Sequence, residues 1–265
     1  MSKLVVTTFD SEAKAYEGTR ALNELHAQGD LTLYGMAVIT KDAGGKLSVK
    51  EGPDALAGTA VGSLVGALVG VLGGPAGVIV GLTAGMLLGG ISDLLNVGVG
   101  MDFLDKVSRE LAPGKAAVIA EIDEDWVTPL NTRMEAIGGS VVRESRSDFE
   151  EAEIVKAAAA DKAELAQLKA ELAQSGAEAK AKLRTRIKEV RAKLGELSNE
   201  AQTKSQKLEK DVNAKISALN DQIAKANAQN KARIKERLVE LRADHDRRVA
   251  KLKQAGALIK EALAA

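Results

Sequence analysis

The residues that could do chemistry are few and lie far apart. The chain has two histidines, His26 and His245, and no cysteine. Because both histidines fall on predicted helices in different regions, zinc or haem ligation and Ser-His or Cys-His catalysis lack their parts. His245 lies on an apolar helical stripe, where a polar residue more often sets register than binds a ligand. We therefore predict no catalytic residue, no metal site, no cofactor and no small-molecule substrate.

Three successive carboxylates, Asp123, Glu124 and Asp125, follow a predicted strand. Such a cluster could coordinate a hard cation. A solvated loop or the start of a helix is the more common setting for adjacent acidic residues, and we expect that setting here.

Glycine recurs at nearly every fourth position in residues 58–90, GTAVGSLVGALVGVLGGPAGVIVGLTAGMLLGG. The segment lacks the Lys-Ser/Thr of a phosphate-binding loop and the spacing of a dinucleotide fingerprint. On a helix, residues four apart share a face, so two arms of such glycines form grooves without side chains, where backbones can pack closely. The packing glycines are Gly58, Gly62, Gly66, Gly70, Gly77, Gly81, Gly85 and Gly89. Gly73, Gly74 and Pro75 predict the turn between the arms of this glycine-zipper hairpin.

The outer faces of the predicted hairpin must be covered, because residues 55–92 carry no charge. Lipid is one cover: an arm of about 18 residues is roughly 27 Å long, near the short limit for a hydrocarbon core of about 30 Å. The flanking residues Glu51, Asp54 and Asp93, and the lack of Trp or Tyr at either end, argue against lipid. A protein-only core formed by several copies is the other cover. The sequence leaves both open.

The hairpin, residues 54–92, is inserted in a predicted α+β head that spans residues 1–148. Alternating apolar residues and turn signals predict strands at 3–9, 31–42, 46–51, 115–122 and 140–145. Helical periodicity between caps predicts helices at 12–28, 101–111 and 129–137. The order β-α-β-β-α-β-α-β predicts a ferredoxin-like sandwich with one added αβ unit.

Residues 149–265 predict a long helical coiled-coil tail, because strong helix formers dominate and no proline follows Pro129. Apolar residues recur with a mean period near 3.6, which implies little or slightly right-handed supercoiling. Unbroken, the tail would be a rod of roughly 165 Å. A reversal near 198–206 or 227–230 is the alternative, and the sequence does not choose. The predicted seam includes Leu165, Leu172, Leu183, Ile187, Leu194, Ile216, Ile223 and Leu241.

Charge is divided unevenly although the net charge is zero. Residues 1–149 hold 12 Lys or Arg and 19 Asp or Glu, whereas residues 150–265 hold 25 and 18. A basic run in the tail comprises Lys180, Lys182, Arg184, Arg186, Lys188, Arg191 and Lys193. A solvated helix face explains this run most simply; anionic lipid, the acidic head of a neighbouring copy and nucleic-acid phosphates are further readings. The tail has no aromatic residue after Phe149 for base stacking, which argues against nucleic acid.

Several stretches together resemble the bacterial family catalogued as domain of unknown function 1269. They are KLVVTTFDSEAKA, the ITKDAGGKLSVKE hairpin, the glycine-rich segment, GISDLLNVGVGMDFLDKVSRELAPGKAAVIAEIDED and IGGSVVRES. The resemblance covers residues 1–158 approximately. It implies an inserted hairpin and membrane association, because members are usually labelled predicted membrane proteins, and it brings no reaction. The helical tail departs from the family pattern.

The sequence therefore favours a non-enzymatic, self-assembling structural protein. The hairpins would cluster in or on a membrane, and the tail would set the spacing of subunits. A soluble giant homo-oligomer or filament and a membrane pore are the alternatives; the pore is the weaker, since only Thr59, Ser63, Thr83 and Ser92 are polar along the arms. The predicted partners are other copies of the chain and an anionic membrane. The predicted location is the cytoplasmic face of the inner membrane, or the cytoplasm as a large assembly.

Overall fold

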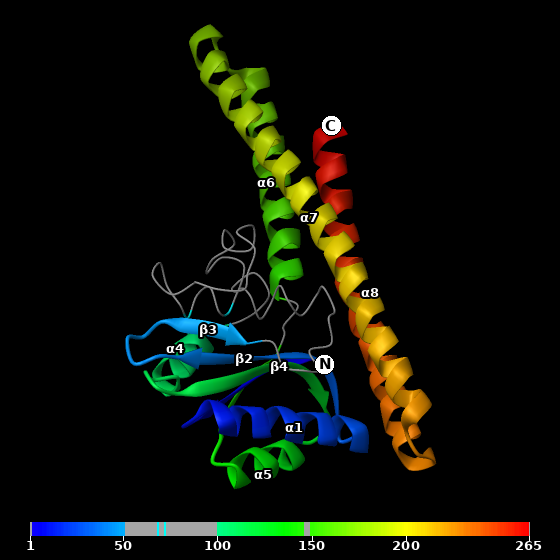
Figure 1. Ribbon diagram of the computed structural model, residues 1–265. Coiled ribbons are helices and arrows are strands. Elements are labelled where there is room, and N and C mark those ends of the chain that lie inside the picture. Colours follow the sequence, from blue (N-terminus) through cyan, green and yellow to red (C-terminus); the bar gives the residue numbers. More distant parts are fainter. Residues whose placement is uncertain (1, 51–67, 69–71, 73–99, 146–148, 265) are drawn as a thin grey trace. The chain divides into compact units, whose positions relative to one another are not determined.

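Figure 1 presents a computed structural model of the chain, which describes residues 2–50, 68, 72, 100–145 and 149–264. Two compact units divide the chain. Unit 1 comprises residues 1–147 and 213–241, and unit 2 comprises residues 148–212 and 242–265. A segment of the helical tail therefore belongs to the same unit as the N-terminal head.

Unit 1 is built on a five-stranded sheet with the order β3-β2-β4-β1-β5. The strands are β1 (Lys3–Phe9), β2 (Leu31–Lys41), β3 (Leu47–Lys50), β4 (Ala116–Glu124) and β5 (Ser140–Ser145). Every neighbouring pair is antiparallel. Because β1 and β2 both pair with β4, these two strands run parallel to each other on either side of it.

Helices α1 (Glu12–Gln28) and α5 (Thr128–Ala136) cover one face of this sheet (Figure 1). Ser11 caps α1 by accepting a hydrogen bond from the Lys14 backbone N–H, and Gly29 ends the helix in the left-handed conformation with φ 77°. Apolar residues of both helices pack against alternate residues of the strands. These include Leu22, Leu25, Leu130 and Met134 from the helices and Val5, Phe9, Val118 and Ile122 from the sheet.

Helix α4 (Met101–Glu110) and residues 213–241 pack in the core on the opposite face. We call residues 213–241 the tail tip. They comprise the end of α7 (Ala177–Lys225), the start of α8 (Ala228–Ala264) and the turn between them. Leu219 and Ile234 of the tail tip are fully buried with Val6 and Ile119 of the sheet. The tail tip is thus part of the hydrophobic core of unit 1.

Unit 2 is a bundle of three helical segments from α6 (Phe149–Gln174), α7 and α8. Its core contains Ile154, Ala158, Leu165, Val190, Leu194, Leu252, Ala255 and Ile259. Ion pairs join the helices at the surface of this bundle: Arg186 of α7 pairs with Glu164 of α6, and Lys162 of α6 pairs with Glu261 of α8.

The α+β class and the long helical C-terminal region predicted from the sequence are confirmed. The tail reverses direction at residues 226–227, between α7 and α8, where the Asn227 side chain accepts a hydrogen bond from the Asn230 backbone N–H. It also breaks at residues 175–176, which the seam pattern did not predict. Gly176 lowers helix propensity there, and the Ser175 hydroxyl donates to the Glu171 carbonyl. Residues 198–206, the other predicted reversal point, lie within continuous α7.

Candidate functional site

Two buried carboxylates lie near the end of β4, the central strand of the sheet. Glu121 and Asp123 follow Ala117 and Ile119 at every second position of β4, so their side chains lie on the same face, which the tail tip covers. Their exposed fractions are 0% and 3%. Burying a carboxylate is costly unless it is paired and hydrogen-bonded, so this face requires a cationic or hydrogen-bonding cover.

Lys215 of α7 supplies the cation. Its Nζ lies 2.5 Å from Oε1 of Glu121, and the two side chains are 4% and 0% exposed. The same ammonium group donates to the Ser2 hydroxyl and lies 5.2 Å from the centre of the Tyr34 ring. A buried ion pair of this kind specifies one arrangement of its elements more than it adds net stability.

Gln222, two turns along α7, binds the segment that links α1 to β2. Its amide nitrogen donates to the carbonyl oxygens of His26 at 2.7 Å and Leu31 at 2.8 Å. Its amide oxygen accepts from the Thr32 hydroxyl at 2.7 Å. One buried side chain therefore binds both the last turn of α1 and the start of β2.

Arg237 of α8 binds the same segment from the second helix of the tail tip. This side chain is 1% exposed and donates to the carbonyl oxygens of Gly29 and Asp30. It also forms an ion pair with Asp125 at 2.8 Å and a hydrogen bond with Thr32. Planar guanidinium groups suit such sites because they offer several donors in fixed directions.

Asn230 completes these contacts by donating from its side chain to the Gln28 carbonyl oxygen. Five backbone carbonyls of the α1–β2 turn, those of residues 26 and 28–31, are thus bound by three side chains of the tail tip. We call these contacts, together with the ion pair of Lys215 and Glu121, the tail-tip site. It holds a loop and a sheet face in one arrangement.

His26 stands at the edge of the tail-tip site and is neutral there. Its Nδ1 accepts a hydrogen bond of 3.1 Å from the Leu33 backbone N–H. Burial lowers the pKa of His26 below its ordinary value of 6.5, and the nearby charges of Lys225 and Arg237 lower it further. A neutral imidazole is what the Leu33 contact needs, because a protonated Nδ1 cannot accept.

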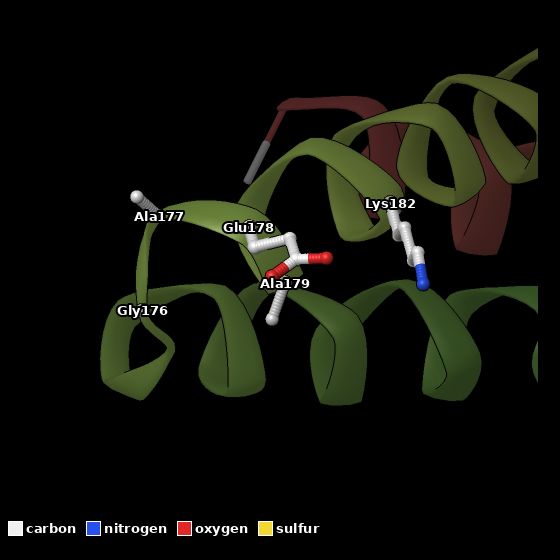
Figure 2. Close-up of a pocket in the computed structure, with 5 residues that line it drawn as sticks. All are labelled: Gly176, Ala177, Glu178, Ala179 and Lys182. Atoms are coloured by element: carbon white, nitrogen blue, oxygen red, sulfur yellow. The ribbon is translucent and has the colours of Figure 1, made fainter.

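Two open hollows lie on the surface. One, of about 560 Å³, is lined by Leu25, Gln28, Asp30, Trp126, Thr128, Pro129, Thr132 and Arg133. Its charged residues already form ion pairs, Arg133 with Glu24 and Asp30 with Arg233. The other, of about 420 Å³, lies at the start of α7 and is shown in Figure 2. Neither set of lining residues contains a histidine or a nucleophile paired with a base.

The predicted hairpin glycines and the predicted turn Gly73-Gly74-Pro75 lie outside the described residues. Two leucines of the first arm are described, and both are helical. Leu68 is fully buried in the core beneath the tail tip, and Leu72 packs partly buried against the same core.

The predicted seam residues lie in both units. Leu165 and Leu194 are buried in the core of unit 2, and Ile187 packs partly buried against it. Ile223 and Leu241 pack partly buried against the core of unit 1. Leu172, Leu183 and Ile216 are half-buried.

The predicted setting of Asp123 and Glu124 is wrong, because both belong to β4 and are buried. Glu124 is bound by Arg143 at 2.7 Å and Lys3 at 3.4 Å. These partners come from other strands, which a local pattern does not reveal, and they make the burial of Glu124 tolerable. Within the described part of the chain, no group of three or more His, Asp or Glu residues is arranged to hold a metal ion.

The residues that make the tail-tip site were missed because they are polar residues of long helices. Lys215 and Gln222 are seven residues apart and flank the seam residue Leu219, so they share its face. That spacing was available in the sequence. The sequence did not reveal the binding partners of Gln222, because these are backbone carbonyls almost two hundred positions earlier in the chain.

No helix among residues 2–50, 68, 72, 100–145 and 149–264 is long and apolar enough to cross a membrane.

Comparison with curated proteins and with solved structures finds no significant match to this chain. Comparison with family models finds a match to the family described as Protein of unknown function (DUF1269), over residues 55–159. The matched range begins at the glycine-rich segment and includes α4, β4, α5, β5 and the start of α6. The resemblance predicted for about residues 1–158 is thereby confirmed over residues 55–159, which match the model of this family.

Proposed function

We propose that this chain is a non-enzymatic, self-assembling structural protein whose glycine-rich segment is the assembly element. In this proposal the segment forms a glycine-zipper hairpin, the hairpins of several copies cluster in or on a membrane, and coiled-coil contacts of the tail set subunit spacing. The partners are then other copies of the chain and anionic lipid. The location is the cytoplasmic face of the inner membrane.

We also propose that the head is ferredoxin-like. If β3 is set aside as an added edge strand, the remaining order β2-β4-β1-β5 matches the split β-α-β arrangement of that fold. Helices α1 and α5 then take the two helix positions on one face. In the chain, the glycine-rich segment follows β3 and precedes α4, and its described residues Leu68 and Leu72 pack in or against the core on the face that the tail tip covers.

The observation that carries the assembly proposal is the coincidence of strict glycine spacing with a charge-free stretch of residues 55–92. Glycine costs about 1 kcal/mol against alanine at each interior helix position, so many glycines in one helix need close packing to offset them. Small residues at every fourth position allow that packing by bringing two backbones together.

A second candidate, a soluble giant homo-oligomer or filament, is favoured by Leu68 and Leu72. Both pack against protein in the core of unit 1, with Leu68 fully buried. An arm that begins in a protein core is suited to contacts with protein along the rest of its length. In this candidate the hairpins form a protein-only core and the assembly lies in the cytoplasm.

The test uses the double variant Gly66→Leu, Gly81→Leu. Light scattering of the purified protein should show the assembly collapsing to small species, because leucine fills both predicted grooves. The matched control is Gly195→Leu, Gly256→Leu, two helical glycines of the tail whose added side chains would enter open space. If the Gly66→Leu, Gly81→Leu variant forms assemblies of the same size as the control and the unaltered protein, the glycine-rich segment is not the assembly element.

Fractionation separates the two candidates. Producing cells are lysed without detergent, and the membranes are washed with high salt and alkaline carbonate. Protein that stays in the washed membranes supports membrane association. Uniform large particles in the soluble fraction, seen by negative-stain electron microscopy, support the protein-only assembly.

A further inference from the structure

The first part of α7 carries cations on a flank that points away from the core of its bundle. Ile187, Val190 and Leu194 of this stretch pack in or against that core. Lys180, Arg184, Lys188 and Arg191 follow one another at steps of four, four and three residues, so they form a single row along the helix. We call these four residues the α7 basic row.

The α7 basic row is accessible. Arg184, Lys188 and Arg191 are exposed and Lys180 is half-exposed. Within the described part of the chain none of the four lies in an ion pair, although their neighbour Arg186 pairs with both Glu164 and Glu189. Among the cations of the basic run, Arg186 thus forms an ion pair with α6, whereas the four residues of the α7 basic row form none with the residues that the structure describes.

The other cations of the run lie on a different side of α7. Lys182 and Arg186 are four residues apart, and Arg186 reaches Glu164 of α6. Figure 2 shows the Lys182 side chain extending on the side of α7 that faces α6. The α7 basic row therefore spans roughly 16 Å of helix length without an acidic member.

We infer that the α7 basic row is an electrostatic docking surface for an anionic membrane. Unpaired, exposed cations in a row match the negative surface of a leaflet that contains acidic phospholipids, and each Lys or Arg near such a surface strengthens binding about fivefold. The row lacks the aromatic side chains with which proteins stack on single-stranded nucleic acid, since the tail has none after Phe149. This surface is separate from the glycine-rich segment and acts whether or not that segment enters the bilayer.

The test compares full-length protein and the variant Lys180→Gln, Arg184→Gln, Lys188→Gln, Arg191→Gln in vesicle flotation. Glutamine keeps helix propensity, and circular dichroism checks that the tail stays helical. The control removes four other exposed tail cations, Lys207, Lys210, Lys253 and Lys260, so that net charge is matched. Vesicles of phosphatidylcholine with phosphatidylglycerol are compared with phosphatidylcholine alone.

We expect the extra binding to phosphatidylglycerol vesicles to fall on the order of several hundredfold in the row variant and far less in the control. High salt should abolish the same extra binding in the unaltered protein. Equal loss in row variant and control overturns the inference, and so does equal binding of the unaltered protein to both vesicle types. Preferential loss of binding to random duplex DNA, without loss on vesicles, assigns the row to nucleic acid and also overturns it. Particle size by light scattering reports separately on self-assembly.

Discussion

The helices α7 and α8 serve two regions of the molecule in different ways. In unit 2 their apolar seam packs with α6, and the ion pairs Arg186–Glu164 and Lys162–Glu261 lie at the surface. Unit 2 also has a buried ion pair, between Arg248 of α8 and Glu151 of α6 at 2.7 Å. In unit 1 the same two helices bury Lys215 and Arg237 against the sheet and the α1–β2 turn. The buried polar contacts of unit 2 are thus centred on one ion pair within a largely apolar core, whereas in unit 1 Lys215, Gln222 and Arg237 form several buried polar contacts with the sheet and the α1–β2 turn.

Removing Lys215 should have the largest effect. Lys215→Ala leaves Glu121 buried without its cation, and we expect unfolding free energy to fall by about 3–5 kcal/mol in urea titrations. The double variant Lys215→Met, Glu121→Leu should recover most of this loss, because neither charge of this pair then stays buried. If the double variant keeps the sheet but does not regain the lost unfolding free energy, side-chain packing rather than charge dominates at this position.

Truncating one buried leucine in each region tests whether the regions are separate. Leu219→Ala in unit 1 and Leu194→Ala in unit 2 each remove a fully buried side chain, and each should cost about 2–5 kcal/mol. Hydrogen exchange should rise in the sheet and α1 for Leu219→Ala, and in α6 and α8 for Leu194→Ala. Identical exchange maps for the two variants would contradict the division into two units.

Gln222→Ala should have a smaller effect, because it removes hydrogen bonds without stranding a charge. It leaves the carbonyls of His26 and Leu31 without this donor, and a cost of about 1–3 kcal/mol is expected. Gln167→Ala is the control, since Gln167 is exposed and bonds only locally to Glu171. Exchange of the amides in the α1–β2 turn should quicken in the first variant only.

Acidification should weaken unit 1 at the α1–β2 turn. The pKa of folded His26 lies below the 6.5 of an unfolded histidine, so the unfolded state takes up the proton first as pH falls. Stability from neutral His26 is therefore present above about pH 6.5 and is lost as pH drops below it. Lys225 and Arg237 repel the added charge, while Asp30 and Asp125 are engaged with Arg233 and Arg237.

His26→Gln isolates this contribution, since glutamine does not titrate. Hydrogen exchange of the turn between pH 7 and pH 5 should depend on pH in the unaltered protein and much less in the variant. The same pH dependence in both proteins would show that other groups are responsible.

The smallest effect is expected at the surface of unit 2. Arg186→Gln removes ion pairs with Glu164 and Glu189 that are open to solvent. Exposed pairs contribute little, so the urea midpoint should stay within experimental error. A clear loss of stability would indicate that the exposed ion pairs of unit 2 also contribute to its stability.

The elements of the head were predictable because their signals are local. The Ser11 cap and Gly29 bound α1, and alternation of apolar residues gave the strands. The burial of Glu121 and Asp123 was not predictable, since it depends on Lys215 and other groups far along the chain. In the tail the seam was readable from its period, but its break at Gly176 and its docking on the sheet were not.

The position of the tail tip in the chain has a consequence for synthesis on the ribosome. The last strand ends at Ser145, and α4 packs on this face of the sheet, yet the cover is not complete until residue 241 has been made. At about 5–20 residues per second, the apolar face that receives Leu219 and Ile234 waits several seconds for its cover. During that interval the nascent head is open to chaperones and to neighbouring nascent chains, so its maturation is timed by the elongation of its own tail.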